Sequence, residues 1–344
     1  MTTTVRPSAA RALAQGIGDV ARAPWLVIAA AAITMAMALP FAVVLGTRLQ
    51  ASLASQPPVA LAETEIDPEW WEEFRRHASG LEATFTPAVL GFAAALDSIS
   101  GLLDGRQPPV AVLGPLALSI VAWAFLWGGI LRRFERGERI GLHRFVESGF
   151  ALLPRFIAIA ALAAAIMIAL YLTWHRLLFG PVYGSLASMI SVERNAFLVR
   201  VLLYLAFIAP LVVVGLIADY ARIASVAGQA HSLGEAMRAG ARFVRDHAGA
   251  VITLFVMAAI ILLIVTVAYG ALEVYGGSQV GGWRAIAIGQ LYILFRLAMR
   301  LAIAASELRL FAPGATRQSP STAAAASVRA QSAVRLSDTQ SPPP

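Results

Sequence analysis

Residues 250–271 read AVITLFVMAAIILLIVTVAYGA, a run of 22 residues without a charged side chain. A helix crosses the hydrocarbon core of a bilayer with roughly 20 apolar residues, so this run predicts a membrane-spanning helix. Five other stretches approach it in length and character. The six predicted spans cover residues 25–46, 110–131, 154–174, 196–218, 250–271 and 283–305. The sequence thus predicts an all-α fold, a polytopic bundle of about six transmembrane helices.

The composition agrees with a membrane protein. Of the 344 residues, 58% are hydrophobic and 14% are charged, which is too little polar surface to cover a soluble globule of this size. The net charge of +7 comes from arginine alone, and the arginines cluster in short segments between the apolar runs. That distribution is typical of membrane topology rather than of nucleic-acid binding. The expected partner is the lipid bilayer, and nucleic acid is excluded.

Metal and redox chemistry have little support. The chain has no cysteine, which excludes disulfides, thiolate nucleophiles and cysteine-based zinc sites. Its five histidines are scattered without a metal-binding motif. His231 and Glu235 are four residues apart and could share a metal, but a solvated helix face is the preferred interpretation. No cofactor and no metal are therefore expected.

The arginines also predict the orientation. They are most frequent before the first span, between the second and third, and between the fourth and fifth. Because cytoplasmic loops carry an excess of basic residues, both termini are predicted to be cytoplasmic, in a multi-pass protein of the cell inner membrane. The first apolar run exceeds the length of a secretory signal, so we expect it to be retained; cleavage near Ala51 or Ala54 is the alternative.

Three regions follow from this topology. Residues 1–24 form a cytoplasmic amphipathic segment, residues 25–311 the helix bundle, and residues 312–344 a disordered cytoplasmic tail rich in Ser, Ala, Gln and Pro. The external loop, about residues 47–109, is acidic. Within it, Asp67 and Pro68 predict the start of a short helix. The apolar segment 87–103 lies on the outer face, roofs the bundle, or inserts and changes the helix count.

A repeat is a further expectation. Small and apolar residues recur at a constant offset between ALAQG at 12–16 and AMRAG at 236–240, and each stretch leads into a span. Residues 145–154 form a weaker third copy. The chain is thus predicted to contain three units, each an amphipathic helix and a transmembrane hairpin, with the apolar helix faces against acyl chains. Chance similarity in an alanine-rich sequence is the alternative.

Three short motifs also suggest a resemblance. They are DYARI at 219–223, AMRAGARFV at 236–244, and the stretch from Gln290 through Arg296 to Arg300. With these motifs the chain resembles uncharacterised bacterial six-helix membrane proteins and, more distantly, the membrane domain fused to some glycerophosphodiester phosphodiesterases. The resemblance covers most of the six-span region and implies a membrane bundle. It implies no phosphodiesterase activity, because the chain has no soluble phosphodiesterase domain.

Ionisable side chains inside spans are costly and are therefore candidate functional residues. Arg296 and Arg300 lie four residues apart on one helical face, at roughly 20 and 26 Å from the outer boundary. Asp219 ends the fourth span at roughly 33 Å, where it could meet Arg300. The first interpretation is a packing clasp between helices; the second is a site for an anion or a lipid headgroup.

Three classes of function remain open. We expect first a non-enzymatic scaffold, assembly or regulatory component, whose partners are other membrane proteins or anionic lipids, because the spans hold few polar groups. The alternative is a transporter or permease for a lipid-like or anionic substrate. A membrane-embedded enzyme is less favoured, because no nucleophile or acid–base set stands at membrane depth.

Overall fold

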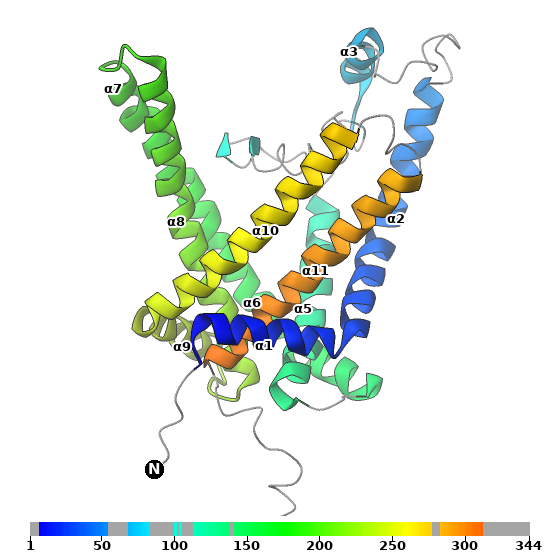
Figure 1. The fold of residues 1–344 in the computed structure, drawn as a ribbon, viewed down its shortest axis with the longest axis vertical. Helices are drawn as coiled ribbons and strands as arrows, with labels where there is room; N and C mark the ends of the chain where they lie inside the picture. Colours follow the sequence, from blue (N-terminus) through cyan, green and yellow to red (C-terminus); the bar gives the residue numbers. More distant parts are fainter. Residues whose placement is uncertain are drawn as a thin grey trace, which may run out of the picture.

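The structure, a computed structural model, describes residues 7–53, 68–80, 82, 100–101, 103–104, 113–137, 141–276 and 283–311. All regular elements in these ranges are helical (Figure 1). They are α1 (Ala9–Ala21), α2 (Pro24–Leu53), α3 (Pro68–His77), α5 (Leu113–Arg136), α6 (Leu142–Leu170), η4 (Tyr171–His175), η5 (Leu178–Val182), α7 (Tyr183–Ala187), α8 (Glu193–Val226), α9 (Leu233–Asp246), α10 (Ala248–Gly276) and α11 (Trp283–Phe311). The predictions for the tail 312–344 and for most of segment 87–103 lie outside the described residues.

Six of these helices are long and apolar enough to cross a membrane: α2, α5, α6 with its continuation, α8, α10 and α11. The predicted all-α polytopic bundle is thereby confirmed. The ends differ from the prediction, since α2 continues to Leu53 and α8 continues to Val226. Asp219 therefore lies inside α8 instead of closing it, and the next turn of the same helix brings in Arg222.

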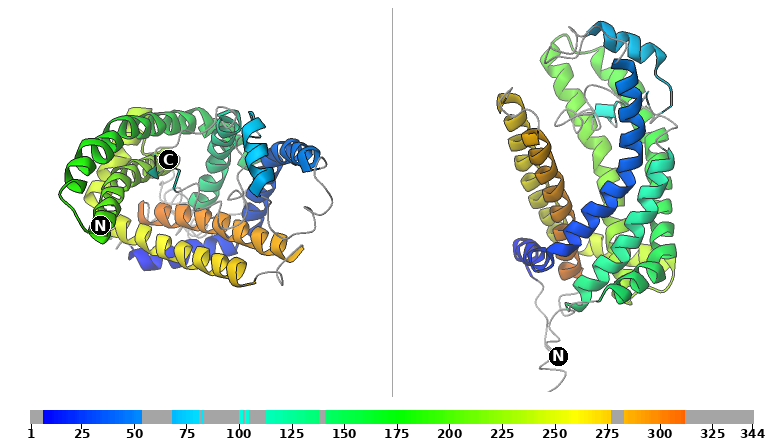
Figure 2. Two further views of the ribbon diagram at one scale, coloured as in Figure 1. Left: turned by 90° about the horizontal axis from the view of Figure 1, so that it is seen from above. Right: turned by 90° about the vertical axis from the view of Figure 1, so that its right-hand side faces the viewer.

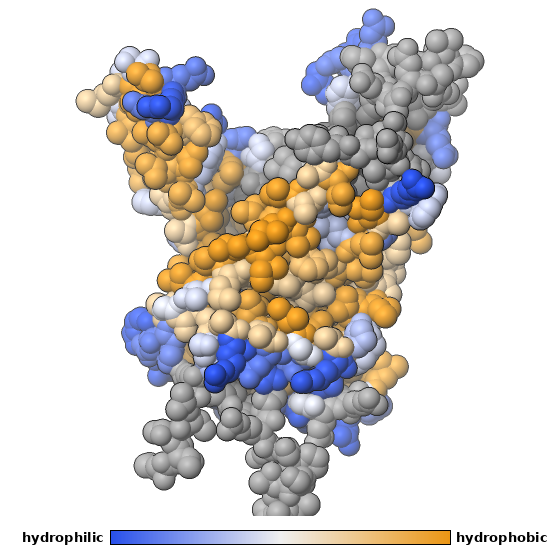
Figure 3. Space-filling view, in the orientation of Figure 1, coloured by the Kyte–Doolittle hydropathy of each residue, from blue (hydrophilic) through white to orange (hydrophobic). Residues whose placement is uncertain are grey.

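The six long helices stand around a ring when seen from above (Figure 2). On one side α10 and α11 run antiparallel, side by side, and α1 crosses below them (Figures 1 and 2). A hydrophobic surface covers α10 and α11, and a hydrophilic belt follows α1 (Figure 3). The side where α1 and α9 lie is called the α1–α9 end below. The change from an apolar band to a polar belt there is what a membrane boundary requires.

The helix α1 packs its apolar face on α11. Ser8 caps it, accepting a hydrogen bond from the Arg11 amide, and Ala12, Leu13 and Gly16 are buried. A Cβ atom on Gly16 would lie 2.5 Å from the Ala302 carbonyl oxygen, so only glycine permits this approach. The apolar face is thus used against protein, and the prediction that it faces acyl chains is wrong.

The helix α9 packs on α8 in the same way. Ser232 and Glu235 form a capping box at its start, and the buried face contains Ala236, Gly240 and Phe243. A Cβ atom on Gly240 would lie 2.6 Å from the Ile217 carbonyl oxygen and 2.9 Å from the Ala221 amide nitrogen. Here too the apolar face meets protein.

The predicted third amphipathic segment, 145–154, is not a separate helix. It is the first part of α6, which begins at Leu142 and continues through Pro154 into the span. It packs on α5 through small residues: a Cβ atom on Gly128 would lie 2.9 Å from both the Gly149 Cα atom and the Ser148 carbonyl oxygen. This unit therefore keeps the close glycine contact, although its amphipathic segment and its first span form one continuous helix.

These three contacts follow a cyclic order. Three units, α1–α2–α5, α6–α8 and α9–α10–α11, each begin with an amphipathic segment. The first part of α6 packs on α5, α9 packs on α8, and α1 packs on α11. Each segment thus packs on the last span of the preceding unit, with the first unit following the third. A three-unit repeat predicts this arrangement, whereas chance similarity does not.

At the opposite end, polar contacts join α2 to α3 and α8 to the segment before α5. Trp70 of α3 is buried, and its indole nitrogen donates to the Ser52 hydroxyl of α2 at 3.1 Å. Tyr204 of α8 donates to the Asp104 carboxylate at 2.9 Å. His175, in the π-helical turns that continue α6, lies 2.8 Å from the Leu103 carbonyl oxygen. Helix α3 begins at Pro68 as predicted, while Asp67 lies outside the described residues.

Candidate functional site

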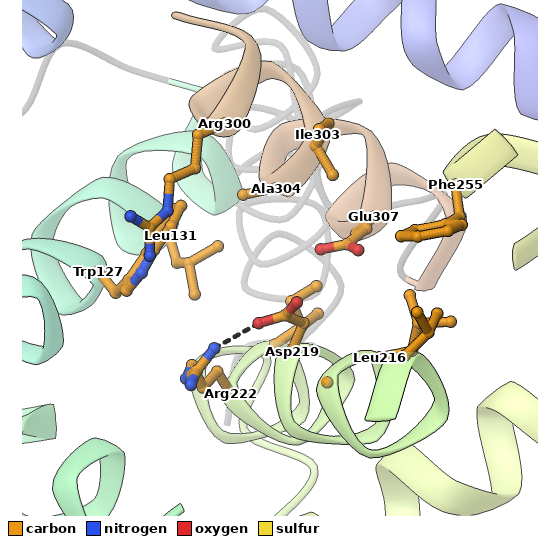
Figure 4. A pocket seen from close by; sticks show the side chains of 13 residues that line it. Trp127, Leu131, Leu216, Asp219, Arg222, Phe255, Arg300, Ile303, Ala304 and Glu307 are labelled. Atoms are coloured by element: carbon orange, nitrogen blue, oxygen red, sulfur yellow. Dashed lines mark hydrogen bonds and ion pairs between the residues drawn. The ribbon is translucent and has the colours of Figure 1, made fainter. Parts of the chain in front are cut away.

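A cavity of about 310 Å³ lies between α5, α8, α10 and α11, towards the α1–α9 end (Figure 4). Most of the lining residues belong to α8 and α11. On each helix they recur every three or four residues, and so they lie on one face of it. The wall residues are Trp127, Leu131, Val212, Gly215, Leu216, Asp219, Arg222, Ile223, Phe255, Arg300, Ile303, Ala304 and Glu307. Most of these are apolar, so the four charged side chains stand in a hydrophobic surround.

Asp219 and Arg222 form an ion pair on α8. They are three residues apart, so one helical turn places both on the cavity face. The Arg222 side chain is 19% exposed and that of Asp219 is 45% exposed, because the carboxylate opens into the cavity. The pair was not predicted from the sequence, because Arg222 lies beyond the predicted end of the fourth span.

Arg300 lies on α11 and stacks on α5. Its guanidinium carbon is 4.0 Å from the ring centre of Trp123 and 5.5 Å from that of Trp127. An arginine over an indole face is stabilised by the ring quadrupole, and it keeps its N–H groups free for an acceptor at its edge. Within the described residues Arg300 makes no ion pair, so its predicted partner Asp219 pairs with Arg222 instead.

Glu307 is the most enclosed of the four, with 5% of its surface exposed. It is seven residues after Arg300, and Ala304 lies between them on the same face of α11. In Figure 4 its carboxylate points into the cavity on the side of Asp219. In the part of the chain that the structure describes, Glu307 makes no hydrogen bond and no ion pair. Glu307 was not among the site residues predicted from the sequence.

Arg296 is not part of the cavity. It lies one turn before Arg300, is exposed, and its guanidinium carbon is 5.7 Å from the Tyr292 ring centre. Helical side chains lean toward the N-terminus of their helix, which for α11 points away from the cavity. The structure therefore separates the two arginines that the sequence paired: Arg300 lines the cavity with Asp219, and Arg296 does not.

Two other candidate positions have structural explanations. Glu235 accepts hydrogen bonds from the backbone amides of His231 and Ser232 at 2.8 and 3.2 Å. Among the described residues no group of three or more His, Cys, Asp or Glu is placed to hold a metal. Tyr220, next to Asp219 on α8, is fully buried beside Phe243, with ring centres 4.6 Å apart.

The arrangement therefore offers a largely apolar cavity lined by two carboxyl groups and two guanidinium groups, whose formal charges sum to zero. Such a lining suits the binding of a polar or charged group attached to an apolar one. Comparison with family models, with curated proteins and with solved structures finds no match to this chain.

Proposed function

We propose that this protein binds the headgroup of a lipid from the inner leaflet in the cavity between α5, α8, α10 and α11, as a membrane carrier or permease for a lipid-like substrate. The observation that carries the proposal is the cavity itself. It combines apolar walls, such as Leu216, Phe255 and Ile303, with four charged side chains. No chemical reaction is part of the proposal.

The depth of the charges supports a headgroup. At 1.5 Å per residue, Glu307 lies about 6 Å from the end of α11 at Phe311, and Arg300 about 16 Å. Asp219 lies about 10 Å from the end of α8 at Val226. These depths range from the headgroup layer into the adjoining acyl chains, where a lipid presents its own polar and apolar parts.

The size supports a headgroup rather than a whole lipid. A volume of about 310 Å³ is at the lower end of the roughly 300–1,000 Å³ typical of ligand pockets. The acyl chains would remain in the bilayer beside the cavity. With the arginine-based topology the α1–α9 end is cytoplasmic, and so the donor leaflet in this proposal is the cytoplasmic leaflet of the inner membrane.

The scaffold or regulatory role expected from sequence becomes the second proposal. It depended on the scarcity of polar groups within the spans, and the cavity brings four charged side chains together. One observation still favours it: Arg238, Arg242 and Arg245 of α9 are exposed on the face turned away from α8. A basic face of this kind suits an acidic partner protein or an anionic membrane surface.

The test is lipid retention. We would purify wild type and Ala304→Leu in mild detergent and identify bound lipids and proteins by native mass spectrometry. Ala304 is buried in the cavity wall between Arg300 and Glu307, so leucine fills the space and leaves both charges. The matched control is Ala259→Leu, on an exposed position of α10 outside the cavity.

We expect one phospholipid on wild type and on Ala259→Leu, and its loss from Ala304→Leu. Equal lipid retention by all three proteins would overturn the proposal. A protein bound in fixed ratio to all three, without a specific lipid, would favour the scaffold.

A further inference from the structure

The four charges of the cavity are not equivalent. Asp219 and Arg222 neutralise each other in an ion pair. Glu307 and Arg300 form no ion pair within the described residues, and each presents its charge to the cavity (Figure 4). Apart from this ion pair, the cavity therefore offers one carboxyl group and one guanidinium group to a ligand.

The two unpaired charges lie at different depths on one helix. Glu307 follows Arg300 by seven residues, which is about two turns and about 10 Å along the axis of α11. The Glu307 side chain leans toward the N-terminus of α11, and therefore toward Arg300. Ala304 lies between them in the cavity wall, and its small side chain leaves space for one ligand to extend from Arg300 to Glu307.

We propose that the bound headgroup is a zwitterion with a phosphate and a primary amine, as in phosphatidylethanolamine, the phosphate at Arg300 and the amine at Glu307. This rests on the proposed function and names its substrate class. A guanidinium presents paired N–H donors that match phosphate oxygens. A ligand cation favours the ionised form of a carboxyl group that is 5% exposed and makes no ion pair, and an ammonium group supplies both charge and donors.

The same side chains disfavour the two common alternatives. A purely anionic headgroup, such as phosphatidylglycerol, would leave Glu307 without a cation and would add negative charge beside Asp219. A choline headgroup carries a cation without N–H donors and is recognised by aromatic faces. Here the nearby indole faces, Trp123 and Trp127, are already occupied by Arg300.

The experiment uses the full-length chain in detergent after delipidation. Dioctanoyl phosphatidylethanolamine, phosphatidylcholine and phosphatidylglycerol are titrated separately, with bound fractions read by native mass spectrometry. We expect phosphatidylethanolamine to bind wild type about tenfold more tightly than the other two, the value of one charge-assisted hydrogen bond. Glu307→Gln should remove that preference, Arg300→Gln should weaken all three lipids, and Arg296→Gln should change nothing.

Free phosphoethanolamine separates a lipid from a soluble zwitterion, and we expect it to bind more weakly than the dioctanoyl lipid. Equal affinity for the two ligands would still support a zwitterionic ligand but would overturn the proposal that this ligand is a lipid.

Equal binding of the three lipids by wild type, abolished by Ala304→Leu, would overturn the headgroup assignment and leave the proposed function standing. If Ala304→Leu has no effect on any lipid, the proposed function itself fails. Gel filtration and thermal unfolding check that each variant is folded. If Glu307→Gln does not fold, the order of the three lipids on wild type decides the headgroup assignment.

Discussion

Arg309 on the last helix donates to the Asp19 carboxylate on the first, with Nη2 at 2.6 Å and Nε at 2.7 Å from Oδ2. The side chains are 18% and 16% exposed. This contact closes the cyclic arrangement, since it joins α1 to α11 across almost the whole described chain. It also fixes the turn of α11 that follows Glu307.

Asp19→Asn should destabilise the protein. The substitution removes the carboxylate charge from a largely buried ion pair, which costs about 2 kcal/mol, between the values for surface and fully buried pairs. Thermal unfolding in detergent measures the change. Arg22→Ala is the control, because Arg22 contacts the same carboxylate at 3.5 Å but is 79% exposed. An equal loss from both variants would contradict the assigned role of Arg309.

Gly240→Ala should loosen α9 from α8. The added Cβ atom would lie 2.6 Å from the Ile217 carbonyl oxygen, and overpacking of this kind costs about 1–3 kcal/mol. On the same helix, Gly234→Ala meets only the end of the Arg238 side chain at 3.8 Å and should be neutral or slightly stabilising. Hydrogen exchange of α9 amides distinguishes the two. Equal protection in both variants would refute the close contact.

The capping box of α9 should respond to pH. The backbone amides of His231 and Ser232 donate to Glu235 and lower its pKa below the ordinary value of 4.5. A lowered folded-state pKa means that the stabilisation is complete above 4.5 and is lost as the pH falls through the folded value. Compared with Glu235→Gln, wild-type α9 should therefore be better protected from hydrogen exchange at pH 7, and the difference should vanish in acid. A difference that grows in acid would reverse the assignment.

The cysteine-free sequence allows a direct test of topology. Arg76→Cys in α3 and Arg242→Cys in α9 each introduce a single thiol on an exposed position. With the predicted orientation, a membrane-impermeant maleimide should label position 76 in intact spheroplasts and position 242 only after lysis. The opposite labelling pattern would show that the predicted orientation is reversed and that the cavity lies in the outer leaflet.

The spans were predictable because each one buries its polar backbone within itself, so a run such as 250–271 specifies a helix without knowledge of its neighbours. The glycine positions were visible as well, since Gly16 and Gly240 recur at equivalent places in the repeat. The sequence could not show whether the apolar faces of these two amphipathic helices pack on lipid or on protein. The periodicity of apolar residues is the same for a helix on lipid and for a helix on protein. A small residue in the middle of the apolar face was the available sign of a contact with another helix.

The charged site was only partly predictable. Asp219 and Arg300 stood out because they are ionisable residues in apolar surroundings, but pairing depends on how far a helix continues. Since α8 extends to Val226, Arg222 lies one turn beyond Asp219 and forms the ion pair. Arg296 and Arg300 share a helical face, yet only Arg300 reaches the tryptophans of α5. Such distinctions arise from contacts between helices and have no local signature.

The proposed lipid headgroup binds in the cavity, at Arg300, and not at an arginine of the same span outside the cavity, such as Arg296. The most direct measurement is the phospholipid retained per protein after purification of Arg300→Gln and Arg296→Gln from native membranes. Arg300→Gln should retain far less lipid than wild type, and Arg296→Gln should retain the wild-type amount. An equal loss in the two variants, or wild-type retention by both, would contradict the account.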